Sequence, residues 1–346
     1  MQRYLRNIDW WLVGAVCALV GIGLMLIASA THSYAVARGE AWFVERQGIF
    51  FGINVLLVIF CLRFDYRLLQ QIAALGAQRW IQIGPVTIQP SEFAKAIIII
   101  CLAAFLAKRA ELYTDFTDYL PAVAYVFVPF VLVMRQPDLG TSLVFAVITL
   151  GMLIISGFKM RWLAMLSGAF VVLLPVFWMI LKEYQKNRIR VFLDPELDPF
   201  GAGYHVIQSK IAIGSGLLTG KGWFSGTQSQ LNFLPENHTD FVFAVAGEEF
   251  GFIGVCVILF LYGIIIWRGL TIALNAEDDF GTLLAVGITF MFTFHMFVNI
   301  GMTAGIMPVT GIPLPFLSYG VSSLTTNMFL VGLLLNIRLR KQQLQF

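Results

Sequence analysis

Long apolar runs separated by short polar segments are the dominant pattern of this chain. A helix needs about 20 mainly apolar residues to cross the hydrocarbon core of a bilayer, so such runs predict transmembrane helices. The clearest runs are Trp11 to Ala30, Gly140 to Gly157, Trp162 to Leu181, Phe250 to Trp267 and Gly281 to Ile300. The first run has no small-residue cleavage site and many others follow it, so we interpret it as a retained helix rather than a signal peptide.

The composition strengthens the membrane interpretation. Of the 346 residues, 58% are hydrophobic and only 12% are charged, against roughly 25% charged residues in a soluble domain. We therefore predict an all-α polytopic membrane protein that forms a single integral-membrane domain over residues 1–346. The four cysteines lie in apolar runs without metal or redox spacing, so no disulfide framework is expected. The net charge of +3 is dispersed, and no nucleic-acid partner is expected.

Basic residues orient the chain, because Lys and Arg concentrate in the cytoplasmic loops of membrane proteins. They predict that both termini are cytoplasmic. The residues behind this expectation are Arg3, Arg6, Arg63, Arg67, Lys108, Arg109, Lys159, Arg161, Arg268, Arg338, Arg340 and Lys341. The longest hydrophilic stretch, residues 182–240, then falls on the periplasmic side. Its Gly, Pro and mixed polar content predicts a structured loop with short helices inside the same domain.

One crossing is missing from this topology. Between Arg67 and Lys108 the chain must cross the membrane twice or not at all, but only one convincing run, about Phe93 to Ala107, lies there. The simplest interpretation is that one helix of about 20 residues is absent between about Arg67 and Gly76. This predicts about nine spans here and about ten in the intact protein. A re-entrant segment is the less favoured alternative, because no Gly/Pro-broken apolar hairpin is present.

Polar residues stand out in two short predicted periplasmic stretches. Residues 76–95, GAQRWIQIGPVTIQPSEFAK, contain Glu92 and Lys95, which share one face of a helix and can pair. Both an interfacial salt bridge and a role in substrate binding fit this pair. In RQPDLGTS, residues 135–142, Asp138 is expected to cap the helix that follows.

The long loop supplies the strongest candidate for chemistry. Asp240 lies where the loop meets an apolar helix, and a carboxylate at low dielectric has a raised pKa that makes it a usable base. The other interpretation, which the physics of the sequence alone favours, is that Asp240 only caps a helix that begins at Phe241. Glu248 lies eight residues further on, on nearly the same helix face, and is interpreted as a supporting residue. The basic residues of the loop either hold a diphosphate or are ordinary solvated side chains: Arg188, Arg190, Lys210 and Lys221.

The last polar stretch, MPVTGIPLPFLSYGVSS over residues 307–323, has Pro and Gly spacing that is incompatible with a regular helix. Unpaired backbone cannot face lipid, so this stretch must line a cavity or pack on protein. His32 and His295 are interpreted as incidental, because neither has a second ligand at metal spacing.

The four polar stretches together resemble the SEDS family, specifically its rod-shape-determining branch, and three segments within them match closely. They are DPELDPFGAGYHVIQSKIAIGSG from Asp194, KGWFSGTQSQLNFLPENHTDF from Lys221 and PLPFLSYG from Pro313. The resemblance extends over essentially the whole chain. It implies a ten-helix glycosyltransferase of the bacterial inner membrane that polymerises lipid II, the undecaprenyl-diphosphate disaccharide-pentapeptide, at a periplasmic site during cell elongation. The implied partners are a class B penicillin-binding protein transpeptidase and the other membrane proteins of the elongation complex.

The resemblance also assigns roles to residues. The essential acid of the family's HTDF motif is Asp240, and the Glu and Lys of its QPSE-x-x-K motif are Glu92 and Lys95. The residues expected to support these or to bind substrate are Arg79, Gln208, Lys210, Glu236, His238, Glu248 and Ser318. Leu217 and Val321 stand where the family commonly has Gly, which puts the local backbone conformation in question.

A reaction hypothesis follows. Asp240 acts as general base on the 4-hydroxyl of the acceptor sugar, which attacks the anomeric carbon of the donor as undecaprenyl diphosphate leaves. Basic residues or a divalent cation, Mg²⁺ or Mn²⁺, would neutralise the diphosphate charge; no other cofactor is expected. The competing functions are a lipid II flippase and a non-catalytic scaffold for the transpeptidase. A flippase should carry charges near the midplane on broken, repeated helices, whereas here the polar residues cluster at one face.

Overall fold

The computed structural model describes residues 8–32, 42–63, 81–83, 86–108, 115–135, 138–181, 183–199 and 201–341. This part of the chain is almost entirely helical, as the apolar runs predict. The long helices are α2 (Trp10–Ala30), α4 (Trp42–Arg63), α5 (Pro90–Ala107), α6 (Leu120–Arg135), α7 (Leu139–Ile155), α8 (Met160–Ile180), α12 (Val242–Leu274), α13 (Asp279–Thr303) and α14 (Val321–Lys341). A hairpin of β1 (Ile81–Ile83) and β2 (Val86–Ile88), with Ile83 opposite Val86, precedes α5.

The helices have the dimensions of membrane spans. Within the described residues, seven helices are long and apolar enough to cross a bilayer, and α7 and α8 contribute two shorter apolar segments. The protein is therefore a multi-pass membrane protein, and the predicted number of about nine spans stays a prediction.

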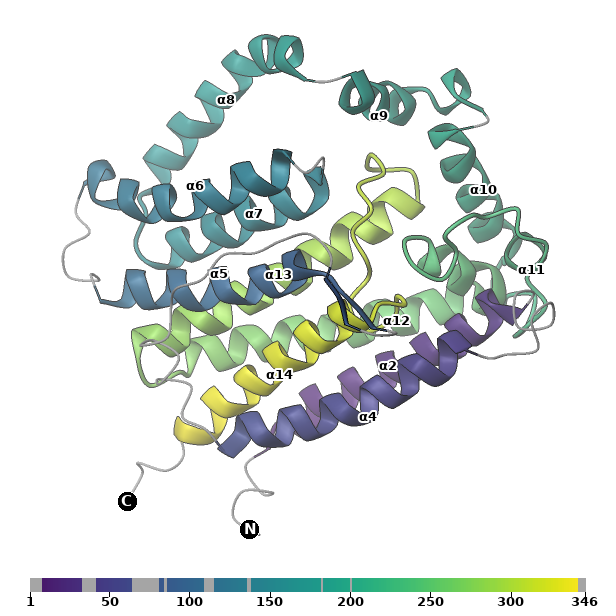
Figure 1. The fold of residues 1–346 in the computed structure, drawn as a ribbon, viewed down its shortest axis with the longest axis horizontal. Coiled ribbons are helices and arrows are strands. Elements are labelled where there is room, and N and C mark those ends of the chain that lie inside the picture. Colours follow the sequence, from purple (N-terminus) through teal and green to yellow (C-terminus); the bar gives the residue numbers. More distant parts are fainter. Residues whose placement is uncertain are drawn as a thin grey trace.

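The centre of the bundle is formed by α12 and α13, around which α2, α5, α7 and α14 pack (Figure 1). Small residues bring the helices close. A Cβ atom at Gly287 of α13 would lie 2.8 Å from the Ile99 side chain of α5, and one at Gly151 of α7 would meet the Phe290 ring at 2.5 Å. Close approach of this kind is the main source of attraction between helices in lipid, where apolar burial between helices gains little.

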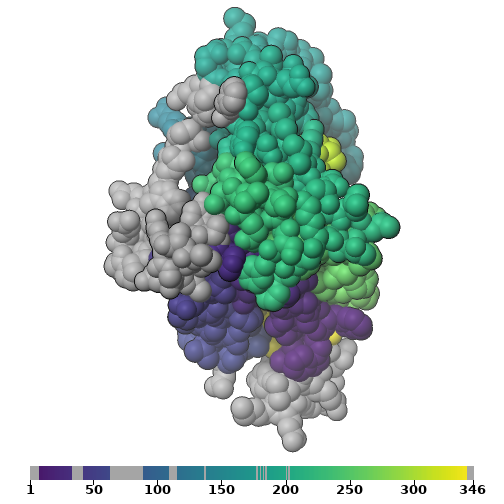
Figure 2. Space-filling view, turned by 90° about the vertical axis from the view of Figure 1, so that its right-hand side faces the viewer, coloured from purple at the N-terminus to yellow at the C-terminus, as the bar shows by residue number. Residues whose placement is uncertain are grey.

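The two ends of the bundle differ. At the end that holds the start of α2 and the end of α14, buried Asp9 pairs with Arg268 of α12 and Arg338 of α14. The opposite end is covered by the segment between α8 and α12. This segment contains α9 (Glu183–Leu193), η4 (Pro195–Leu197), α10 (Ala202–Ser215) and α11 (Thr227–Gln230), so the predicted short helices are present. Figure 2 shows it beside the ends of α2 and α4.

Helix α12 is broken at Gly251, whose φ of 64° and ψ of −163° are non-helical. The loop after α10 fills the break. Lys221 and Gly222 donate their backbone N–H groups to the carbonyls of Glu248 and Glu249, both at 3.0 Å. The carbonyls of Leu217 and Leu218 accept from Phe252 and Ile253 at 2.9 and 3.1 Å. The apolar run predicted from Phe250 is therefore only the second part of a longer, interrupted helix.

The two departures from the family pattern have different structural consequences. Leu217 has a φ of 48°, in the left-handed region that favours glycine, so its side chain is held in a strained backbone conformation. Val321 is the first residue of α14 and has no positive φ. The residue that replaces glycine therefore has a strained backbone at position 217, whereas the replacement at position 321 is tolerated.

The predicted missing helix, between about Arg67 and Gly76, lies outside the described residues and stays a prediction. Its described flanks are nevertheless informative. Cys61 accepts a hydrogen bond from Asn336 near the end of α14, at 2.6 Å, whereas Gln89 donates to Ser322 at the start of α14, at 2.9 Å. These contact points lie about 20 Å apart along α14. Cys61 and Gln89 therefore lie toward opposite ends of the bundle.

Candidate active site

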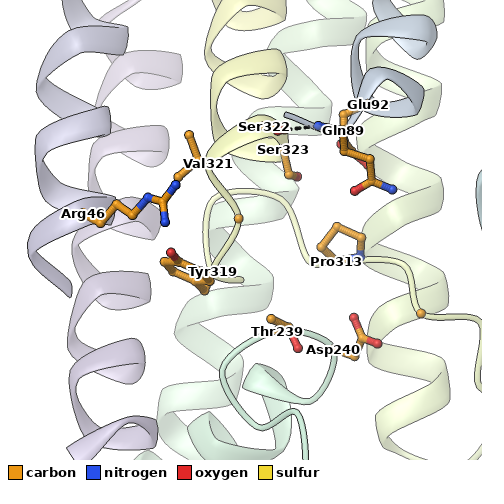
Figure 3. Close-up of a pocket in the computed structure, with 12 residues that line it drawn as sticks. Arg46, Gln89, Glu92, Thr239, Asp240, Pro313, Tyr319, Val321, Ser322 and Ser323 are labelled. Carbon is orange, nitrogen blue, oxygen red and sulfur yellow. Dashed lines mark hydrogen bonds between the residues drawn. The ribbon is translucent and has the colours of Figure 1, made fainter. Parts of the chain in front are cut away.

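A cavity of about 300 Å³ lies at the end of the bundle that carries the long loop (Figure 3). It is formed where α4, α5, the start of α14, the residues before α12 and the segment between α13 and α14 meet. It is lined by Arg46, Gln89, Glu92, Thr239, Asp240, Gly311, Pro313, Tyr319, Gly320, Val321, Ser322 and Ser323. The volume is at the lower end of the range for small-molecule sites. The segment 307–323 thus lines a cavity, as its sequence predicts.

The Asp240 carboxylate projects into this cavity and has no hydrogen bond or ion pair to any other described residue (Figure 3). Helix α12 begins at Val242 with Phe241 as its N-cap and without a capping side chain. The interpretation of Asp240 as a helix cap is therefore wrong. Asp138, by contrast, accepts from the Thr141 backbone N–H at 3.0 Å, which confirms its predicted role as the cap of α7.

The surroundings of Asp240 favour its protonated form. Burial raises the pKa of Asp240 to about 6, and the nearby Glu236 and Asp138 carboxylates act in the same direction. The Arg188 guanidinium of α9 lowers this pKa. An acid with a pKa about one unit below neutral is mostly ionised at pH 7 and still basic enough to accept a proton.

Three neighbouring contacts fix the backbone around Asp240. Asn299 of α13 donates from Nδ2 to the carbonyls of Asp240 and Ile312, at 2.9 and 2.8 Å. The Ser318 hydroxyl donates to the Thr239 carbonyl at 2.6 Å, and the Tyr319 N–H donates to the His238 carbonyl at 2.8 Å. Ser318, predicted to support the site, therefore joins the segment before α12 to the segment before α14.

Glu92 and Lys95 pair as their spacing on α5 predicts, at 2.7 Å between Nζ and Oε1. Both are almost fully buried, with exposed fractions of 3% and 2%. Glu92 also lines the cavity, and the burial of both side chains places the pair inside the bundle, whereas its predicted role in substrate binding stays a prediction. His295 of α13, interpreted from the sequence as incidental, lies 3.0 Å from Lys95 Nζ.

Arg46 and Tyr319 form the wall across the cavity from Glu92 (Figure 3). Burial raises the pKa of Tyr319, and the hydrogen-bonded Arg46 guanidinium lowers it. Sequence reasoning missed Arg46. One signal could have found it, because Arg46 is a basic residue at the predicted periplasmic end of a span, where the positive-inside rule disfavours it.

The supporting residues Glu236 and His238 lie next to Asp240. Glu236 is exposed, has a φ of 52°, and accepts from the Thr239 hydroxyl at 3.0 Å. The His238 ring lies 5.0 Å from the Phe43 ring and 5.9 Å from the Tyr319 ring. Burial lowers the pKa of His238, against an opposing effect of Glu236, which favours a neutral ring.

Glu248 lies outside the cavity wall. It is fully buried and accepts from Lys221 Nζ at 2.8 Å and from the backbone N–H groups of Gln228 and Ser229 at 2.9 and 3.2 Å. Its role is to hold the long loop on α12. Lys221 is consequently engaged by Glu248, which leaves it a weaker candidate for diphosphate binding.

The remaining predicted residues are further from the cavity or outside the described part. Lys210 and Gln208 lie on α10, and neither lines the cavity; Ser209 between them donates to the Thr303 carbonyl at 2.7 Å. Arg79 lies outside the described residues. Among those described, no three His, Cys, Asp or Glu side chains form a group that could hold a metal ion.

Comparisons with known proteins agree with this architecture. Residues 72–343 match a family model described as cell cycle protein, of the FtsW, RodA and SpoVE type. The peptidoglycan glycosyltransferase MrdB of Escherichia coli (strain K12) is 46% identical over 270 residues, 78% of this chain and 73% of the relative. Stage V sporulation protein E of Bacillus subtilis (strain 168) is 38% identical over 358 residues, 95% of this chain and 96% of the relative.

Two solved structures share the fold. A chain from a peptidoglycan synthase complex that coordinates polymerization and crosslinking has a TM-score of 0.77 at 32% identity, covering 97% of this chain and 99% of that chain. Crystalline RodA, the rod shape determining protein of Thermus thermophilus, has a TM-score of 0.67 at 26% identity, covering 97% and 98%.

The family match over residues 72–343, the relatives and the shared fold lead to one conclusion: the chain belongs to the cell cycle protein family of FtsW, RodA and SpoVE.

Proposed function

We propose that this protein is a peptidoglycan glycosyltransferase that polymerises lipid II during cell elongation, with Asp240 as its general base. The names of the relatives support the activity. The observation that carries the role of Asp240 is its unpaired carboxylate in the cavity, with a pKa raised to about 6. A residue of this kind is a strong candidate for acid–base chemistry.

The proposed reaction is a single displacement. The 4-hydroxyl of the acceptor sugar attacks the anomeric carbon of the donor, and its proton passes to Asp240. The bond between the anomeric carbon and the diphosphate oxygen breaks, and undecaprenyl diphosphate leaves with the electron pair. Because diphosphate is already a good leaving group, one carboxylate is sufficient, in contrast to the paired acids of glycoside hydrolysis.

Positive charge is needed where the diphosphate develops its negative charge. Arg46 lines the cavity, and Arg188 is close enough to Asp240 to affect its pKa. Arg188 has no hydrogen-bond partner among the described residues, so its guanidinium is available for a phosphate. A divalent cation, Mg²⁺ or Mn²⁺, is the alternative source of charge, and loss of activity on chelation would identify it.

The proposed location is the bacterial inner membrane, with both termini cytoplasmic and the cavity facing the periplasm. The proposed partner is a class B penicillin-binding protein, together with other membrane proteins of the elongation complex. Similarity to a chain of a synthase complex that couples polymerization to crosslinking supports a transpeptidase partner. Co-purification with a single-span penicillin-binding protein tests it, and full activity of the isolated chain would argue against dependence on a partner.

The decisive experiment is polymerisation of purified lipid II by the reconstituted Asp240→Asn variant. An amide cannot accept the proton, so the rate should fall by about 10²–10⁴-fold. The matched control is Asp138→Asn, which should retain most activity because Asn caps a helix as well as Asp does. A flippase or a scaffold needs no ionised Asp240, and an Asp240→Asn variant with near wild-type polymerisation would exclude the proposed base.

A further inference from the structure

A chain of three buried polar side chains runs from the cavity into the bundle between α5 and α13. Glu92, Lys95 and His295 are exposed by only 3%, 2% and 2%. Lys95 Nζ lies 2.7 Å from Glu92 Oε1 and 3.0 Å from His295 Nε2. His295 Nδ1 lies 2.8 Å from the carbonyl oxygen of Met291. The histidine is thus the innermost member of a chain whose other end reaches the site.

The partners of His295 determine its tautomer. A carbonyl oxygen only accepts hydrogen bonds, so Nδ1 must carry the hydrogen that faces Met291. An ammonium group only donates, so Nε2 must present its lone pair to Lys95. His295 is therefore the neutral Nδ1–H tautomer. Of these three side chains, only Lys95 and Glu92 carry a charge.

The second carboxylate oxygen of Glu92 is not used by the other two side chains. Glu92 lines the cavity, and its Oε2 is buried without a hydrogen-bond partner in the described structure. An unpaired buried carboxylate oxygen destabilises the fold, because it has given up its hydrogen bonds to water without replacing them. A group left unsatisfied at the wall of a cavity is suited to accept a hydrogen bond from a bound ligand.

We propose that His295 is a positioning residue, which holds the Lys95 ammonium on Glu92 Oε1 so that Glu92 Oε2 stays available to an O–H or N–H group of the saccharide-peptide substrate. This inference rests on the proposed function for the identity of the substrate. It assigns His295 no contact with the substrate and no part in proton transfer.

The physical reason is the number of donors on a buried ammonium. Lys95 has three N–H groups, and His295 accepts one of them. Without that acceptor, the second oxygen of Glu92 is an unused acceptor on the carboxylate that Lys95 already contacts. Lys95 would then engage both carboxylate oxygens and withdraw Oε2 from the cavity. Substrate binding would weaken while Asp240 and its proton transfer stay intact.

Two substitutions of His295 separate this role from simple packing. In His295→Gln, the side-chain oxygen of the glutamine is the same number of bonds from Cα as Nε2 of the histidine. It can therefore accept a hydrogen bond from Lys95. In His295→Asn, the side chain reaches only as far as Nδ1, so it can contact Met291 but not Lys95. The Asn variant should raise KM for lipid II about 10-fold or more with kcat within about 2-fold, whereas the Gln variant should stay within about 3-fold of wild type. Equal kinetics of the two variants would overturn the proposal.

A second measurement needs no variant and no activity. The chain has only four histidines, so ¹⁵N spectra of histidine-labelled protein in bilayers can be assigned. The expected result is a neutral His295 with Nδ1 protonated and Nε2 as an acceptor. An Nε2–H tautomer or a charged ring would overturn the proposal. Failure of the wild-type protein to polymerise lipid II would instead reject the proposed function. The tautomer measurement would then still test whether His295 accepts a hydrogen bond from Lys95.

Discussion

At the scale of single residues, the site combines a reactive group with a cost to stability. Asp240 keeps an unpaired carboxylate in a partly closed cavity, where burial opposes its ionised form. Because the folded state favours the protonated acid, ionisation at neutral pH destabilises the fold. The same burial that suits Asp240 to its proposed role as a base therefore makes the native structure less stable than it could be.

This cost predicts how stability and activity depend on pH. The pKa of Asp240 is about 6 in the folded state against a usual value of 3.8. The folded-state pKa is the higher one, so the fold has its full stability below pH 4, where Asp240 is protonated. That stability is partly lost as pH rises through 6 and Asp240 ionises. At pH 8 the cost is at most about 3 kcal/mol, less whatever solvent at the cavity mouth screens.

Asp240→Asn should consequently melt at a higher temperature than wild type at pH 8, and the difference should close by pH 4. The polymerisation rate of wild type should fall as pH drops through about 6, because the base becomes protonated. Melting curves in detergent at the two pH values, together with a pH–rate profile, check both expectations. A variant that melts lower at pH 8 would contradict the assigned pKa direction.

At the scale of elements, the break in α12 sets the position of the long loop. Both halves of the interrupted helix leave backbone groups without helical partners, and the segment from Leu217 to Gly222 satisfies them. The loop therefore reaches α12 through main-chain hydrogen bonds that do not depend on side-chain identity. Gly251 makes this possible, because a Cβ atom there would lie 2.2 Å from the backbone nitrogen of Gly220.

Gly251→Ala should therefore lower the melting temperature, with a loss of roughly 2–4 kcal/mol from the disallowed backbone conformation and the clash. Gly263→Ala is the matched control in the same helix, since a Cβ atom at Gly263 meets nothing within 4 Å. That control should be neutral or gain about 0.5–1 kcal/mol from helix propensity. Equal melting of the two variants would mean that the break can be closed without penalty.

At the scale of the whole molecule, one ion cluster joins three helices at the end of the bundle opposite the cavity. Asp9 is fully buried, accepts from the Leu12 N–H at 3.2 Å, and pairs with Arg268 at 2.8 Å and with Arg338. It therefore caps α2 and connects it to α12 and α14. Because α12 and α14 also begin at the cavity, their packing couples both ends of the molecule.

Asp9→Ala leaves two partly buried guanidinium groups without their carboxylate and α2 without its cap. We expect a loss of about 3 kcal/mol or more in thermal unfolding, because a broken buried ion pair leaves an uncompensated charge. The control is Glu183→Gln on α9, which removes an exposed carboxylate with partners Lys186 and Arg190 and should not change the melting temperature. A similar effect of both variants would argue against a role of the Asp9 cluster in stability.

The sequence alone determined the membrane class, most helices and the polar stretches that form the site. This was possible because the spacing of apolar residues and the placement of Lys and Arg are local properties. The partition of each segment between lipid and water depends directly on them. The Glu92–Lys95 pair and the Asp138 cap were predictable for the same reason, since each depends on residues three positions apart.

Only the tertiary structure decided which polar side chains meet and that Asp240 lines a cavity and does not cap α12. Asn299 and His295 come from the interior of α13, where no local pattern distinguishes them from ordinary polar residues. His295 contacts Lys95 across 200 positions of sequence, and Asn299 contacts Asp240 across 59. Such contacts depend on how helices pack, which small residues and close fits determine. Hydrophobic pattern does not encode that packing, because in lipid every apolar face is equally well solvated.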